Sequence, residues 1–116
     1  MALSAFEYKR AEKLVGEFVE RRRPPVHIRG QVDFAFRVER QSVVLFEIRP
    51  GWRGAPGETM EQPCAKATCV KARGVWRIYW MRADLKWHAY APFPEVRDLE
   101  SFLRVVAEDA HHCFFG

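Results

Sequence analysis

Residues 75–93, VWRIYWMRADLKWHAYAPF, decide the fold, because they hold three of the four tryptophans and two of the three tyrosines of the chain. Residues 76–80 and 87–91 alternate between two faces, as in two β-strands that are joined across the polar break at 81–86. A large aromatic side chain buries about 150–250 Å² when it packs, so we expect this hairpin to anchor the core.

Two amphipathic helices are predicted, one near each end of the chain. Residues 4–22 begin with a capping-box pattern at Ser4 and Glu7, and the Pro24-Pro25 pair stops the helix. Residues 96–110 repeat apolar side chains at helical spacing. The apolar sides of these two helices need one apolar face of a β-sheet to pack against.

Three more strands are predicted between the first helix and the aromatic hairpin. Residues 32–39 and 43–49 alternate as a hairpin, and residues 65–71 form a weaker strand. We match Phe34 with Phe46 on the apolar face, because a slip of one residue would turn either strand inside out. This register leaves four charged side chains together on the other face: Asp33, Arg37, Glu47 and Arg49.

The predicted fold class is α+β, as a single domain over residues 1–116. An antiparallel sheet of about five strands carries the N-terminal and C-terminal helices on one face, and residues 50–63 form a long irregular loop. The core prediction places Trp76, Ile78, Trp80 and Trp87 against Leu14, Phe18, Leu99, Phe102 and Val106.

Composition excludes several classes of protein. No run approaches the ~18 apolar residues of a membrane span, and the first residues lack the pattern of a signal peptide. Three cysteines suggest no disulfide framework, so we expect a reduced, cytoplasmic protein. The sequence has no phosphate-cradling Gly-rich loop, and we expect no cofactor. The net charge is +4, but residues 21–91 carry 14 Lys and Arg against 6 Asp and Glu, which favours an anionic partner.

Several short motifs resemble, in their order, a small bacterial family catalogued as domain of unknown function 3024. The motifs are Arg23-Pro24-Pro25, Phe46-Glu47-Ile48-Arg49-Pro50, Ala65-Lys66, residues 76–80, residues 82–88 and the closing Cys113-Phe114-Phe115-Gly116. The resemblance covers nearly the whole chain and implies a bacterial, single-domain, cytoplasmic protein. It implies no activity. One departure is His112, where the family pattern has glycine.

The first functional hypothesis is a non-enzymatic binding module with a basic, aromatic sheet face for nucleic acid or another phosphate-bearing ligand. Positive charge attracts phosphate, and aromatic rings stack on bases. Trp52 lies in the predicted loop and is a further candidate contact. The candidate ligand-binding residues are Arg37, Arg49, Trp52, Arg77, Tyr79, Arg82, Lys86 and His88.

The second hypothesis is a divalent-metal phosphodiesterase that uses Asp33, Glu47 and Lys66. Two facing carboxylates bind a hard cation, and a lysine polarises the attacked phosphate. A cross-strand charge ladder, Asp33 with Arg49 and Arg37 with Glu47, explains the same residues without any catalysis.

Two other interpretations stay open. A structural or protein-interaction domain, including a dimer, would dock through the loop at 50–63 and an uncovered sheet face where Val43, Leu45, Tyr79 and Tyr90 are partly exposed. A zinc site would need side chains from two distant segments, and ordinary reduced thiols are the simpler interpretation. The zinc candidates are Cys64, Cys69, His111, His112 and Cys113.

Overall fold

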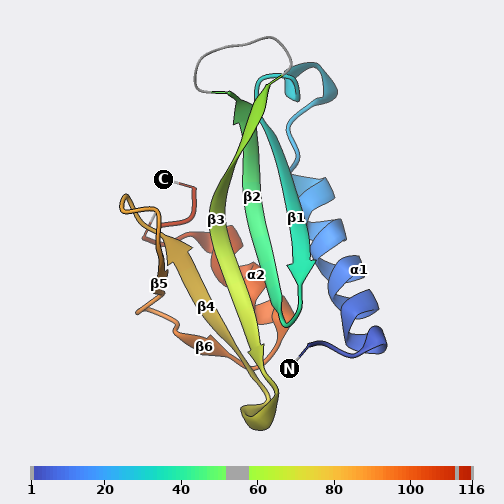
Figure 1. The fold of residues 1–116 in the computed structure, drawn as a ribbon, viewed down its shortest axis with the longest axis vertical. Coiled ribbons are helices and arrows are strands. Elements are labelled where there is room, and N and C mark those ends of the chain that lie inside the picture. The colour runs from blue at the N-terminus through green and yellow to red at the C-terminus, as the bar shows by residue number, and fades with distance from the viewer. Residues whose placement is uncertain (1, 52–57, 112, 116) are drawn as a thin grey trace.

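The computed structural model of the chain describes residues 2–51, 58–111 and 113–115. Two α-helices and an antiparallel sheet form an α+β domain, as predicted (Figure 1). The elements are α1 (Ala5–Arg22), β1 (Asp33–Glu39), β2 (Ser42–Pro50), β3 (Thr59–Val70), β4 (Val75–Met81), β5 (Trp87–Ala89), β6 (Glu95–Val96) and α2 (Leu99–Glu108). Short 3-10 helices span Val26–Ile28 and Lys71–Arg73.

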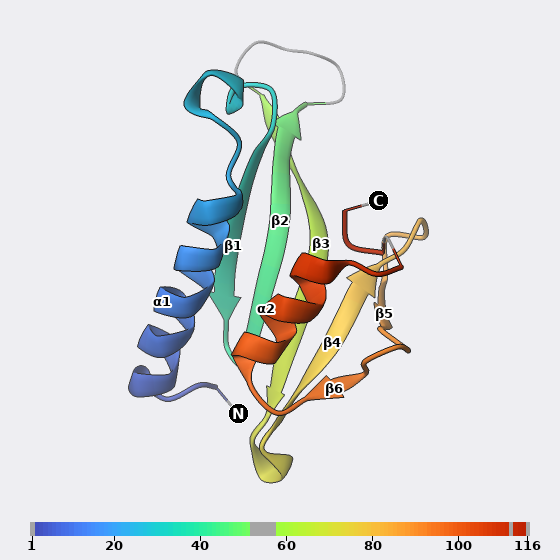
Figure 2. The same ribbon diagram turned by 180° about the vertical axis from the view of Figure 1, so that it is seen from behind.

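The sheet is a meander in the order β1-β2-β3-β4-β5, and the two-residue strand β6 adds to β4. Both helices lie on the same side of this sheet, in front of it in Figure 2 and behind it in Figure 1. Among the residues that the structure describes, no helix lies on the opposite side. We call it the open face.

Local signals define both helices. Ser4 caps α1 through a capping box with Glu7, as the sequence predicts. Asp98 caps α2, and Asp109 ends it in a left-handed conformation with φ of 40°. The helix is therefore shorter than the predicted 96–110, because Val96 belongs to β6 and the helix begins only after its cap at Asp98.

The register of β1 and β2 differs from the prediction by one residue. Phe34 lies opposite Glu47, and Phe36 opposite Leu45, so Val43 and Leu45 face the helices. The sequence of β2 is apolar on both faces and leaves this choice open. The two-residue connection at 40–41 closes the hairpin at Glu39 and Ser42 and thereby fixes the register.

The register of β4 and β5 corrects a second prediction. Trp80 lies opposite His88 and Met81 opposite Trp87, because five residues, 82–86, connect the strands. Opposite residues share a face of the sheet. Trp87 therefore lies on the open face and not in the core, where the sequence placed it.

β3 is longer than predicted and takes up part of the expected loop. It begins at Thr59, pairs with β2 along its length, and shifts register at Cys64. It pairs with β4 only from Ala65 onward. The earlier part, which includes Pro63, has an edge without a described partner strand, and such an edge tolerates proline. The two strands thus separate as a fork.

The core lies between the sheet and the helices. Ile78, at the centre of β4, is fully buried. Trp76 and Trp80 face the helices as predicted but are only half-buried. Val43, Leu45 and Tyr90 are fully buried on this side, which contradicts the predicted partly exposed patch; Tyr79 alone of that set is half-buried on the open face. The helix-side core also contains Val15, Phe18, Phe34, Leu99, Phe102, Val106 and Phe114.

Candidate functional site

The open face carries a lysine between two aromatic side chains. Lys66 in β3 lies opposite Tyr79 in β4, and its Nζ is 5.0 Å from the ring centroids of both Tyr79 and Trp87. All three side chains are half-buried. Partial burial lowers the pKa of Lys66. We call this set the Lys66 cluster.

A second cation–aromatic contact lies two strands away on the same face. The Arg37 guanidinium is 4.8 Å from the centroid of Phe46, and Val44 lies directly opposite Arg37. Phe46 is buried although no helix covers it. Arg37 also forms ion pairs with Glu39 and Glu61, which raise its pKa. Arg37 therefore serves first as a cover for the apolar part of the open face.

Arg77 lies on the open face where β6 pairs with β4. It is opposite Thr68 of β3 and Glu95 of β6, and its Nε is 3.7 Å from the Glu95 carboxylate. Arg73 binds both oxygens of that carboxylate, at 2.6 and 2.9 Å. About half of the Arg77 side chain is exposed. An incoming anion therefore reaches Arg77 more easily than Arg37.

The remaining predicted contact residues do not gather on the open face. Arg49 and Arg82 line the fork between β3 and β4. Lys86 is exposed in the β4–β5 turn. His88 lies on the helix side, opposite Trp80, and contacts Asp84. The prediction for Trp52 lies outside the described residues.

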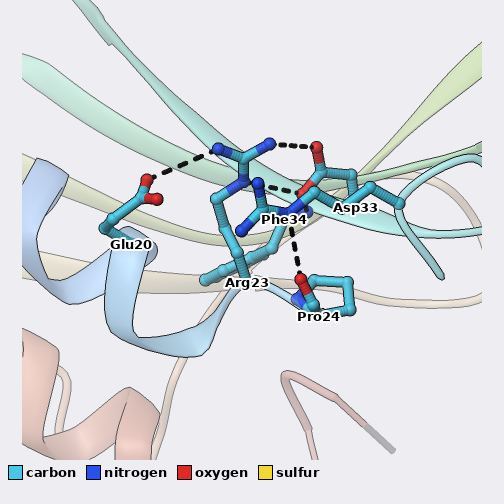
Figure 3. A network of polar contacts seen from close by, with 6 residues as sticks. Glu20, Arg23, Pro24, Asp33 and Phe34 are labelled. Carbon is cyan, nitrogen blue, oxygen red and sulfur yellow. Dashed lines mark hydrogen bonds and ion pairs between the residues drawn. The ribbon is translucent and has the colours of Figure 1, made fainter. Parts of the chain in front are cut away.

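Asp33 is occupied by an arginine that the sequence did not suggest. Arg23, at the end of α1, donates from Nε to Oδ1 at 3.0 Å and from Nη2 to Oδ2 at 2.8 Å (Figure 3). The backbone N–H of Phe34 also donates to Oδ1. These bonds hold the pKa of Asp33 below its usual value. The predicted pairing of Asp33 with Arg49 is wrong.

The other members of the predicted metal site, Glu47 and Lys66, have partners of their own. Glu47 pairs with Arg49 at 3.0 Å, not with Arg37, and it lies on the opposite face of the sheet from Asp33. Lys66 belongs to the aromatic cluster. Over the part of the chain that the structure describes, no three His, Cys, Asp or Glu side chains come together as a metal site.

The cysteines are packed as free thiols. Cys64 donates to the Leu45 carbonyl at 3.3 Å, and burial raises its pKa to about 12. Cys69 is buried opposite Trp76, and Cys113 is half-buried. A neutral, buried thiol is a poor nucleophile and a poor metal ligand. The zinc candidate His112 lies outside the described residues.

Comparison with known proteins gives one family. The profile described as "Domain of unknown function (DUF3024)" matches residues 3–116. The chain belongs to this family. The resemblance found in the motifs is therefore confirmed. No curated protein and no solved structure matches the chain. No helix among the described residues is long and apolar enough to cross a membrane.

Sequence reasoning missed two members of the Lys66 cluster as binding residues. It assigned Lys66 to catalysis and Trp87 to the core. The length of the connection decides this placement: the sequence indicates a six-residue break at 81–86, whereas the structure has five residues, 82–86. A connection of odd length places residues of the same number parity on the same face. Applied to residues 79 and 87, it brings Tyr79 and Trp87 together.

Proposed function

We propose that the protein is a non-enzymatic module that binds single-stranded nucleic acid on its open face. The observation that carries this proposal is the Lys66 cluster, an ammonium with the rings of Tyr79 and Trp87 each 5.0 Å away on a sheet surface without a helix. Aromatic rings on a sheet stack with bases irrespective of sequence, and a nearby cation meets the phosphate.

Stacking is the main attraction in this proposal, and charge is the lesser one. Arg37 already has two carboxylate partners, so its positive charge is largely compensated. Arg77 extends the path of the phosphates along the open face from Lys66. A double helix hides its bases, and it would meet only the cations. We therefore expect a strong preference for single strands.

The free thiols fit a reducing, cytoplasmic location.

Fluorescence anisotropy with a labelled oligonucleotide of about 12 nucleotides tests the proposal. We expect Tyr79→Ala and Trp87→Ala each to weaken binding by about five-fold to more than a hundred-fold, since stacking contributes about 1–3 kcal/mol per base. Tyr8→Ala is the matched aromatic control, because Tyr8 is exposed on α1.

Two further arms make the result decisive. Lys66→Gln should weaken binding, whereas Lys13→Gln, which removes an exposed charge from α1, should not. A duplex of the same length should bind far more weakly than the single strand. Equal binding of the duplex, or wild-type affinity of both aromatic variants, would refute the proposal.

The metal-dependent phosphodiesterase gains no support from this arrangement. Arg23 holds both oxygens of Asp33, and Lys66 is committed to two aromatic rings. The protein-interaction hypothesis keeps Tyr79 as a surface residue but loses Val43, Leu45 and Tyr90 to the core.

A further inference from the structure

The fork between β3 and β4 contains a hollow of about 730 Å³. Four other hollows of the molecule hold between 240 and 300 Å³ each. Sites for small molecules usually fall between about 300 and 1,000 Å³. The C-terminal segment runs into this gap in both views, between β3 and the β4–β5 turn (Figures 1 and 2). None of the Lys66 cluster lines it.

The walls of this fork cleft are mostly apolar. Met60 and Pro63 come from β3, Met81 from β4, and Phe114 and Phe115 from the C-terminal segment. Thioethers are polarisable and adapt to ligands of varied shape. The Cys64 thiol, which also lines the cleft, stays neutral because burial raises its pKa. The walls thus suit an apolar ligand body and offer no reactive thiolate.

The charges that line the cleft leave one cation without an acidic partner. Glu47 pairs with Arg49, and Glu61 pairs with Arg37. Arg82 makes no ion pair with any carboxylate of the described residues, and its guanidinium lies 5.4 Å from the Trp80 ring centroid. A guanidinium binds a carboxylate through two parallel hydrogen bonds. The cleft is therefore complementary to an acidic group.

The β4–β5 turn presents an exposed leucine beside this arginine. Leu85 lines the cleft, is 80% exposed and has φ of 61°. A branched side chain in the left-handed region is unfavourable, and asparagine or glycine is preferred there. Turn stability alone does not explain a leucine at this position. A contact with an apolar ligand does.

We propose that the fork cleft binds an amphipathic carboxylate, such as a medium-chain fatty acid. Its acyl chain lies along Met60, Met81 and Phe115, and Leu85 closes over it. The carboxylate lies at Arg82. This site shares no residue with the Lys66 cluster, although Met81 lies opposite Trp87, and its test does not depend on the nucleic-acid proposal.

Titration calorimetry with dodecanoate, below its critical micelle concentration, tests this site. Dodecanol and dodecyltrimethylammonium carry the same chain with a neutral and a positive head. We expect dodecanoate to bind at least ten-fold more tightly than either. Arg82→Gln should remove that preference. Arg97→Gln is the matched control, because Arg97 lines the smaller pocket between α1 and α2 and should change nothing.

Leu85→Asn separates a ligand contact from a structural role. Asparagine relieves the backbone strain at φ 61°, so the variant should melt at a higher temperature and still bind dodecanoate several-fold more weakly. A lower melting temperature would show that Leu85 supports the fold instead, and would overturn its proposed role. No binding of dodecanoate, or equal binding of the three amphiphiles, would overturn the whole proposal.

Discussion

Replacing Ile78 with alanine should cost far more stability than replacing its neighbour Tyr79, because the two side chains lie on opposite faces of β4. Ile78 is 0% exposed and faces the helices. The substitution removes three carbons, worth about 0.8 kcal/mol each by transfer, and leaves a cavity, so we expect a loss of about 2–5 kcal/mol. Tyr79 is half-buried and loses one cross-strand pair with Lys66, about 1 kcal/mol.

Equilibrium unfolding in urea, followed by far-ultraviolet circular dichroism, measures both losses. With a slope of about 1–3 kcal/mol per molar urea, Ile78→Ala should lower the midpoint by about 0.7 molar or more. Ile78→Val, with an expected loss of about 0.5–1.5 kcal/mol, keeps the test valid if the alanine variant does not fold. If Tyr79→Ala is as damaging as Ile78→Ala, the faces are assigned wrongly and the open-face site fails with them.

Two further predictions concern single positions. Asp33→Asn should lower the free energy of unfolding at pH 7, and this loss should shrink below about pH 4, because a carboxylate with a lowered pKa stabilises the fold only while it is ionised. Urea unfolding across this pH range measures the loss, and a loss that stays constant with pH would contradict the Arg23 pairing. Gly74→Ala should cost about 1–2 kcal/mol, since Gly74 has φ of 63° and an added Cβ would meet nothing within 4 Å; a much larger loss in the same assay would point to a contact instead.

Elements with local signals could be predicted from the sequence. The capping box at Ser4, the Pro24-Pro25 stop and the apolar spacing of α2 act within a few residues, and the structure has both helices. The α+β class followed from these helices and the alternating strands between them. The β6 strand could not be anticipated, because two residues show no alternation.

Sheet faces could be predicted only where one face of a strand is polar. In β2, Val43 and Leu45 compete with Val44 and Phe46, and hydrophobicity cannot choose between the two sets. The turn at 40–41 fixes the register, and with it the set of β2 side chains that faces the helices, through the positive φ of Arg40 and its two-residue length. Turn geometry thus determines which charged residues reach the open face.

Side-chain pairs between distant elements were the least predictable part of the site. Arg23 reaches Asp33 because the chain between α1 and β1 turns back through a 3-10 helix. Lys66 meets Trp87 only because β3, β4 and β5 are neighbours in the sheet. Both contacts depend on strand order and register. Arg37, Arg77 and Tyr79, which the alternation in the sequence places away from the core, lie on the open face.

The ion pairs determine how binding on the open face should respond to salt. A phosphate at Arg37 must compete with Glu39 and Glu61. Lys66 contacts two aromatic rings and forms no ion pair with a carboxylate among the described residues. We therefore expect two or three phosphate contacts. Each lowers the slope of log K against log salt by about 0.7 for a single strand, so the slope should be about −2.

Anisotropy titrations between about 50 and 200 mM salt measure this slope. If all 14 cations of residues 21–91 contributed, the slope would approach about −10. Such a value would mean that the uneven charge of the chain binds the nucleic acid diffusely and that the Lys66 cluster does not direct it. A slope near −2 that becomes less negative by about 0.7 in Lys66→Gln, with an unchanged slope in Lys13→Gln, would locate the phosphate contact at the cluster itself.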